Sequence, residues 1–104
     1  MIYISIPISG HDERKQREKA DQIKNMLSKR GYTPVNPFEI YSGKNPTYFD
    51  YISHDLRALA DCDAIYMCKD WQTSKGCKVE HFFAETYGKK IMFEPVERTD
   101  TFWR

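Results

Sequence analysis

The hydrophobic residues of this 104-residue chain fall into two patterns, short apolar runs and stripes with helical spacing. Short apolar runs bounded by turn residues are typical of buried strands, and they predict strands at residues 2–6, 32–36, 64–68 and 91–93. Apolar residues spaced three or four apart predict three helices between these strands. The first is opened by the polar run 11–19 and closed by Gly31, the second covers about 47–60, and the third covers 76–88.

Strands that alternate with helices predict a parallel sheet built from right-handed crossovers. Pro34 cannot donate a ladder hydrogen bond, so the second strand is expected at an edge. We therefore expect an α/β, flavodoxin-like or Rossmann-like three-layer sandwich whose four parallel strands run in the order 2-1-3-4. Ligands of such sheets bind beyond the carboxyl ends of the strands, here between the first and third strands. The turn Ser9-Gly10 and residues 70–80 are expected to converge at that point.

Two acidic residues fall on or beside apolar helix faces. The stripe expected to face the core on the third helix consists of Val79, Phe82, Phe83 and Tyr87. Glu80 lies on the flank of that stripe, and Asp55 lies inside the apolar arc of the second helix. A buried charge is costly, and two carboxylates across a small cleft are what cleavage of a glycosidic bond requires. In the alternative interpretation, a backbone N–H or a lysine satisfies each carboxylate and neither has a catalytic role.

Composition narrows the class of protein. Sixteen basic and fifteen acidic residues leave a net charge of +1, so charge alone indicates neither a nucleic acid polymer nor a membrane as partner. No apolar run reaches 18 residues, and the chain enters a strand pattern at Ile2 instead of a signal peptide. The length predicts one domain over residues 1–104, with residues 94–104 as a polar tail apart from Phe102 and Trp103.

Several kinds of chemistry have no motif in this chain. The three cysteines, Cys62, Cys68 and Cys77, form no CxxC pair and fit a reducing cytoplasm. No His or Cys pair has metal-ligand spacing, so no metal is expected. The chain also has no GxGxxG, Walker A or GxSxG motif, which argues against dinucleotide chemistry, P-loop hydrolysis and an elbow serine. We therefore expect no cofactor.

Three motifs, taken in order and spacing, carry a family resemblance. They are Tyr3-Ile4-Ser5-Ile6-Pro7-Ile8-Ser9-Gly10, Asp55-Leu56-x-x-Leu59-x-x-Cys62-Asp63 and Ser74-x-Gly76-x-x-x-Glu80. Together they resemble the nucleoside 2-deoxyribosyltransferase superfamily over roughly residues 2–94. The small uncharacterised DUF4406-type members and the 2-deoxynucleoside 5-monophosphate N-glycosidases are the most similar of its branches.

The resemblance implies roles for individual residues. Glu80 matches the nucleophile that takes the sugar C1, and Asp55 matches the acid that contacts the sugar and assists departure of the base. Ser74 matches a residue that helps to hold a 5-phosphate, and the turn Ile8 to Gly10 matches the lining of the sugar pocket. The expected substrate-binding residues are Ser5, Pro7, Ile8, Ser9, Gly10, Asp70, Trp71, Ser74 and Gly76.

The chain departs from the family pattern at three places. Ile6 stands where the family usually has Gly, so it is expected to narrow or reshape the sugar pocket. Lys78-Val79 replaces the Gly-Tyr that precedes the nucleophile of the monophosphate glycosidases, which leaves the sugar and phosphate preference open. Trp71 is expected either to stack on a base or to act as a hydrophobic plug or dimer contact.

Two functions follow from these observations. The first is an enzyme that cleaves or transfers the N-glycosidic bond of a small-molecule nucleoside or nucleoside 5-monophosphate. The alternative is a nucleotide-binding or sensing module that has lost turnover, which Ile6 favours. A homodimer or higher homo-oligomer is also expected, because a small chain buries little core, Phe102-Trp103 would be exposed, and the resembling enzymes complete their sites across a dimer.

Overall fold

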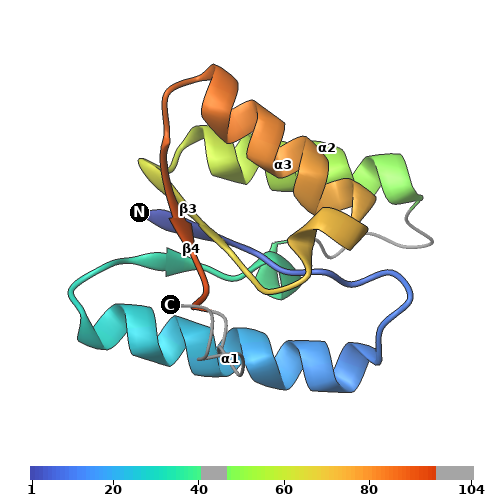
Figure 1. Cartoon of the computed structure of the whole chain (residues 1–104), viewed down its shortest axis with the longest axis horizontal. Coiled ribbons are helices and arrows are strands. Elements are labelled where there is room, and N and C mark those ends of the chain that lie inside the picture. The colour runs from blue at the N-terminus through green and yellow to red at the C-terminus, as the bar shows by residue number, and fades with distance from the viewer. Residues whose placement is uncertain (41–46, 96–104) are drawn as a thin grey trace, which may run out of the picture.

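The computed structural model of the chain describes residues 1–40 and 47–95, which form a three-layer α/β sandwich (Figure 1). Its sheet has the order β2-β1-β3-β4, and all three strand pairs are parallel. The strands are β1 (Ile2–Ser5), β2 (Pro34–Val35), β3 (Ala64–Met67) and β4 (Lys90–Phe93). The predicted fold class and strand order are therefore confirmed. The edge strand β2 is only two residues long and begins at Pro34, the residue that cannot donate to a neighbour.

Three helices flank the sheet, and a side chain caps the N-terminus of each. They are α1 (Glu13–Lys29), α2 (Tyr48–Ala60) and α3 (Lys75–Thr86). Asp12 caps α1, Thr47 and Asp50 form a capping box on α2, and the hydroxyl of Ser74 accepts from the Cys77 N–H at the start of α3. Because these side chains satisfy N–H groups that have no partner inside a helix, they fix where each helix begins.

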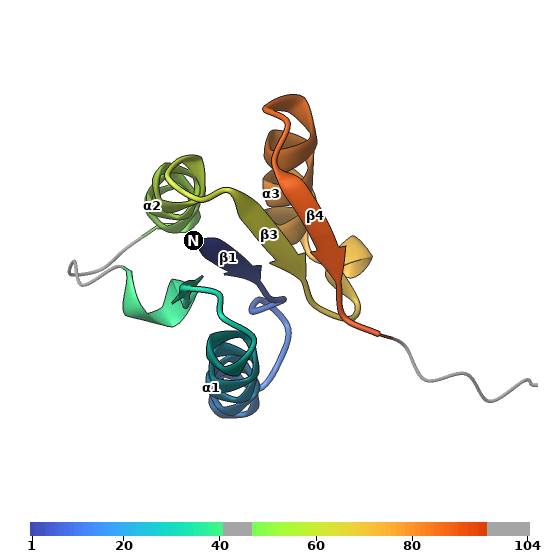
Figure 2. The ribbon, with the colours of Figure 1, turned by 90° about the vertical axis from the view of Figure 1, so that its left-hand side faces the viewer.

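The sheet separates two apolar clusters. The helix α1 lies on one side of the sheet, and α2 and α3 lie on the other (Figure 2). Since side chains alternate along a strand, β1 sends Ile2 and Ile4 to the face covered by α1, and Tyr3 to the face covered by α2 and α3. Ala20 and Leu27 of α1 complete the first cluster. The second cluster includes Leu59, Ile65, Met67, Cys77 and Ala84. The helices α2 and α3, which carry Asp55 and Glu80, therefore lie on the same side of the sheet.

The predicted inner face of α3 is wrong. Val79, Phe82 and Tyr87 are 41%, 68% and 66% exposed, and the buried residues of α3 are Cys77, Glu80 and Ala84. Glu80 turns inward because Tyr3 and Ser5 of β1 donate hydrogen bonds to it. The small buried residues Cys77 and Ala84 of the same helix let α3 approach the sheet. Three residues of the predicted stripe, Val79, Phe82 and Tyr87, are consequently exposed, and only Phe83 packs against the second cluster.

Two short 3₁₀ helices lie between the predicted elements. They are η1 (Pro37–Glu39), which follows β2, and η2 (Trp71–Thr73), which follows β3. Residues 41–46 lie outside the described residues, as do Phe102 and Trp103. Within residues 1–40 and 47–95, no helix is both long enough and apolar enough to cross a membrane.

Candidate active site

Glu80 is a buried carboxyl group held by two hydroxyl groups from the central strand. Its side chain is 4% exposed. The Tyr3 hydroxyl donates to Oε2 at 2.8 Å, and the Ser5 hydroxyl donates to Oε1 at 2.7 Å. Tyr3 and Ser5 are two residues apart on β1, so their side chains point to the same face of the sheet, the one that α3 covers. The orientation of Glu80 is thus fixed before any ligand arrives.

Asp55 of α2 lies beside Glu80 and titrates with it. Burial raises the pKa of Glu80 to about 8, and the nearby charge of Asp55 adds to this shift. Burial likewise raises the pKa of Asp55 to about 6, opposed by hydrogen bonding to Glu80 and Tyr3. Two carboxyl groups in such contact hold a proton between them at neutral pH, and their apparent pKa values belong to the pair. Burial also raises the pKa of the Tyr3 hydroxyl, which keeps it a hydrogen-bond donor.

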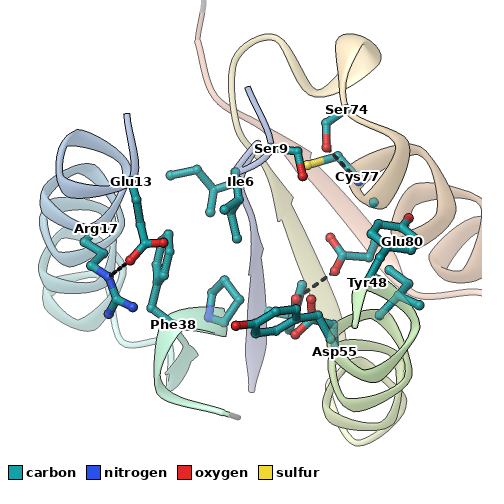
Figure 3. A pocket seen from close by; sticks show the side chains of 16 residues that line it. Ile6, Ser9, Glu13, Arg17, Phe38, Tyr48, Asp55, Ser74, Cys77 and Glu80 are labelled. Carbon is teal, nitrogen blue, oxygen red and sulfur yellow. Dashed lines mark hydrogen bonds and ion pairs between the residues drawn. The ribbon is translucent and has the colours of Figure 1, made fainter. Parts of the chain in front are cut away.

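Both carboxyl groups line a cavity of about 380 Å³ at the carboxyl end of β1 (Figure 3). Residues after β1 and β2 and from α1 form one side, and α2 and the first turns of α3 form the other. The lining comprises Tyr3, Ile6, Ile8, Ser9, Glu13, Arg17, Pro37, Phe38, Tyr48, Tyr51, Ile52, Asp55, Ser74, Gly76, Cys77 and Glu80. This volume falls in the range of pockets that bind small organic ligands.

Several of the predicted site residues meet in this cavity. Ile8, Ser9, Ser74 and Gly76 line it together with Asp55 and Glu80. Ile6 also lines the cavity, at the position where the resembling family usually has Gly. Ser5 is fully buried behind the lining, and its hydroxyl bonds to Glu80.

Four other predicted site residues are not part of the cavity lining in the described chain: Pro7, Gly10, Asp70 and Trp71. Asp70 has a left-handed backbone, with φ at 68°, which turns the chain at the end of β3. Trp71 then stacks on His81 of α3 with ring centroids 4.4 Å apart, and its ring lies 6.1 Å from that of Phe93. The indole therefore packs against side chains of α3 and β4 and is partly buried beside the second cluster.

Sequence reasoning missed much of the cavity wall. Tyr3 had a detectable signal, because a tyrosine in a buried strand needs a partner for its hydroxyl. Glu13 and Arg17 belong to the polar run that predicts only a solvent-exposed helix face, and no local pattern reveals that η1 lies opposite them. The remaining missed lining residues are Pro37, Phe38, Tyr48, Tyr51, Ile52 and Cys77.

The cysteines supply no activated nucleophile. All three are free and buried. Burial raises the pKa of the Cys77 thiol to about 11 and that of Cys68 to about 12, which keeps both thiols protonated. Among residues 1–40 and 47–95, no group of three His, Cys, Asp or Glu side chains is placed to hold a metal ion.

The fold is similar to that of a solved protein. The structure is similar to that of a 2-desoxiribosyltransferase from Leishmania mexicana, with a TM-score of 0.67 and 17% sequence identity. The match covers 88% of this chain and 61% of that protein, so this chain spans less than two thirds of its relative. The protein therefore has a 2-deoxyribosyltransferase-like α/β fold, with a buried carboxyl pair in its cavity.

The family is identified by sequence. The chain belongs to the DUF4406 family, described as a domain of unknown function, whose model matches residues 1–93. No curated protein matches the chain.

Proposed function

We propose that the protein cleaves or transfers the N-glycosidic bond of a nucleoside, a deoxynucleoside or a corresponding 5-monophosphate, with Glu80 as the nucleophile. The observation that carries this proposal is the buried Glu80–Asp55 pair in a cavity of about 380 Å³. The motif resemblance and the 2-deoxyribosyltransferase-like fold support the same reaction class.

The Glu80–Asp55 pair carries the one proton that the proposed reaction needs. At neutral pH the raised pKa values leave about one proton shared by the two carboxyl groups. The contact between the two groups lets this proton pass to Asp55 when a substrate binds. Glu80 is then an anionic nucleophile, and Asp55 is an acid next to the leaving base.

The proposed reaction has two steps. A carboxylate oxygen of Glu80 attacks C1′ of the sugar, the bond from C1′ to the base nitrogen breaks, and that nitrogen takes the proton of Asp55 together with the bonding electron pair. Water then attacks C1′, the ester bond to Glu80 breaks, and Asp55 accepts the proton of the water. Transfer differs only in the second step, where the nitrogen of an incoming base replaces water.

Tyr3 and Ser5 position the nucleophile in this scheme. Their hydroxyl groups hold one carboxyl oxygen each, at 2.8 and 2.7 Å, and so limit the rotation of the Glu80 side chain. They also stabilise its ionised form, which opposes the effect of burial on its pKa. These two hydrogen bonds therefore help Glu80 to ionise for the reaction although its carboxyl group is buried.

The second candidate function is a nucleotide-binding module without turnover. Ile6 supports it, because a branched side chain that is 4% exposed occupies the cavity wall where the resembling family has Gly. In this case the cavity retains its ligand, but C1′ does not reach the Glu80 carboxylate. Binding without release of base distinguishes this module from the enzyme.

A substrate panel tests the proposal. The protein is incubated with nucleosides, 2′-deoxynucleosides and their 5-monophosphates, and free base is measured by chromatography, with and without a second base as acceptor. Turnover of at least one substrate is expected, and Glu80→Gln should abolish it while leaving ligand binding nearly intact. Glu85→Gln is the matched control, since Glu85 is an exposed acid on the same helix. Equal activity of Glu80→Gln and the wild-type protein would contradict the proposed nucleophile.

We also propose that the chain works as a homodimer or higher homo-oligomer. The exposed apolar side chains of α2 and α3 support this, namely Tyr48, Phe49, Tyr51, Val79, Phe82 and Tyr87. A groove of about 270 Å³ lined by Leu56, Val79, Phe82, Phe83, Thr86 and Tyr87 lies on the same helices. Tyr48 and Tyr51 also line the cavity, so a second copy on this surface would lie beside the carboxyl pair.

We propose a cytoplasmic location as well, which the three reduced cysteines support.

A further inference from the structure

One cavity wall carries charged and aromatic groups that the proposed chemistry does not use. Glu13 and Arg17 of α1 and Phe38 of η1 line the cavity across from Asp55 and Glu80 (Figure 3). The Arg17 Nε lies 3.0 Å from Glu13 Oε2, and its guanidinium carbon lies 4.7 Å from the centre of the Phe38 ring. A planar ring beside a hydrogen-bonding cation and anion is suited to a flat heteroaromatic ligand.

This wall is fixed without a ligand. Asn36 caps η1 by accepting from the Phe38 N–H at 3.0 Å, and it donates to Asp21 of α1 at 3.3 Å. Lys24 of α1 and Glu39 of η1 form an ion pair at 2.9 Å. These contacts join η1 to α1, so Phe38 keeps its place next to Arg17. The position of η1 against α1 is therefore fixed, whereas the side chains of Arg17 and Glu13 are 53% and 65% exposed.

The hydrogen-bond donors of Arg17 and the acceptors of Glu13 follow one another in a definite order along α1. Arg17 contacts Glu13 through Nε, and within the described residues no hydrogen bond to its Nη groups is present. Those groups offer two parallel N–H donors, and the Glu13 carboxylate offers acceptors next to them. The wall thus presents two donors followed by acceptors along one helix face.

Guanine has the complementary order. Its N7 and O6 are neighbouring acceptors, which is the pair that arginine binds in a bidentate manner, and its N1–H and N2 amino groups are neighbouring donors. Adenine places its amino donor between two acceptors. Either a donor of Arg17 then faces the amino donor, or an acceptor of Glu13 faces a ring acceptor. Thymine alternates acceptor, donor and acceptor. Cytosine has neighbouring acceptors, N3 and O2, but only one donor group beside them, the N4 amino group, so it matches the order with one donor group fewer than guanine. A 5-phosphate on this wall is opposed by the charge of Glu13.

We propose that Glu13 and Arg17 are the specificity-determining residues of the cavity and select guanine as the leaving base, with N7 and O6 of the base on Arg17 and its N1–H and N2 groups on Glu13. The identity of the reaction rests on the proposed function, but base selection concerns binding and is measurable without turnover. In this arrangement the sugar lies between the base and the carboxyl pair, and its 5 end lies toward Ser9 and Ser74.

Calorimetry on the Glu80→Gln protein tests base selection without turnover. The affinity for 2′-deoxyguanosine should exceed that for 2′-deoxyadenosine by about tenfold or more, since a good bidentate contact discriminates to about that degree. The same comparison with the two 5-monophosphates covers a phosphate requirement. Arg17→Lys keeps the charge but loses the paired donors, and Glu13→Gln turns one acceptor into a donor. Each change should reduce the guanine preference to about threefold or less.

Arg14 and Glu18 provide the matched control. They form an i, i+4 ion pair at 3.6 Å on the same helix and do not line the cavity. Arg14→Lys and Glu18→Gln should leave the guanine preference unchanged, and thermal unfolding of all variants checks that they fold. Equal affinity for the two bases, or a preference that survives Arg17→Lys and Glu13→Gln, would overturn the base selection. Release of base from both nucleosides at similar rates would overturn it while leaving the glycosidase proposal standing. Absence of base release with an intact guanine preference would instead remove only the glycosidase proposal.

Discussion

Ser5 and Glu80 are 75 positions apart in the sequence, yet a 2.7 Å hydrogen bond joins their side chains in the interior. Ser5 is fully buried, and Glu80 is nearly so. This bond ties the first strand to the third helix, and it satisfies one oxygen of the carboxyl group on which the proposed chemistry depends. The same contact thus serves both stability and reactivity.

Ser5→Ala should weaken both. Because Glu80 Oε1 would lose its donor in a buried place, the free energy of unfolding is expected to fall by about 1–3 kcal/mol. The pKa of Glu80 should rise further, since the hydrogen bond from Ser5 favours the ionised form. Urea unfolding and the pH dependence of base release measure the two effects. Ser53→Ala is the control, because Ser53 is exposed and bonds only to a backbone carbonyl of its own helix. Equal loss of stability in the two variants would show that the buried bond contributes nothing specific.

Stability should decrease as the pH rises. The pKa of Glu80 is raised from 4.5 to about 8 and that of Asp55 from 3.8 to about 6. The folded state therefore binds more protons than the unfolded state between these limits, so its advantage is complete below about pH 4 and is lost as the pH passes through the folded values. Urea unfolding at several pH values from about 5 to about 8 measures this slope.

Glu80→Gln should flatten that slope. The amide has no charge to bury, so the variant is expected to be more stable than the wild-type protein at about pH 8 and to lose less stability between about pH 5 and that value. Glu85→Gln should retain the full slope, since Glu85 is exposed. A slope that Glu80→Gln leaves unchanged would assign the titration to other groups.

The sheet was predictable because it follows from local patterns and general rules. Apolar runs identify the strands, their alternation with helices implies parallel pairing, and Pro34 places β2 at an edge. The inward direction of Asp55 and Glu80 was also visible in the sequence, as acids on or beside apolar helix faces. The turn residues Ile8 and Ser9 were found because they follow a strand whose carboxyl end faces a cavity.

The predictions that failed concern residues whose surroundings depend on contacts between distant segments. The stripe of Val79, Phe82 and Tyr87 has helical periodicity, but periodicity does not reveal whether the sheet or the solvent meets it. The direction of Trp71 depends on the left-handed backbone of Asp70, which no apolar pattern encodes. Arg17 resembles any exposed helix residue until η1 brings Phe38 over it.

Ile6 decides between the two proposed functions. Its side chain belongs to the core cluster against α1 and also lines the cavity. Ile6→Val removes one methylene group, should cost about 0.5–1.5 kcal/mol of stability, and should widen the cavity slightly. If Ile6 limits access to Glu80, base release should increase while affinity changes little. Ile23→Val, in the same cluster but outside the cavity lining, is the control for the packing effect. An unchanged rate in the active enzyme would remove Ile6 as the restriction.

The apolar surface of α2 and α3 predicts self-association. Phe82 is 68% exposed, so Phe82→Lys should leave the fold intact but place a charge in the proposed interface. Light scattering at micromolar concentration should give a multiple of 12.3 kDa for the wild-type protein and a smaller particle for the variant. Gln22→Lys, an exposed position on α1 across the sheet, is the control. A wild-type particle of 12.3 kDa would contradict the oligomer.

Asp55→Asn separates the two carboxyl roles. The change removes the charge that adds to the raised pKa of Glu80, so the pKa of Glu80 should fall. The variant also lacks the proton for the leaving base, and base release should slow by about 10²–10⁴-fold, the usual contribution of a general acid. Substrates whose bases leave without protonation should lose much less. The pH–rate profile should therefore lose its falling limb, because the variant has no second carboxyl group to deprotonate, while its plateau drops. Asp50→Asn is the control, because Asp50 is a half-buried capping residue of the same helix that does not line the cavity. A falling limb that persists in Asp55→Asn would mean that Asp55 is not the acid whose deprotonation ends activity, and the paired mechanism would fail.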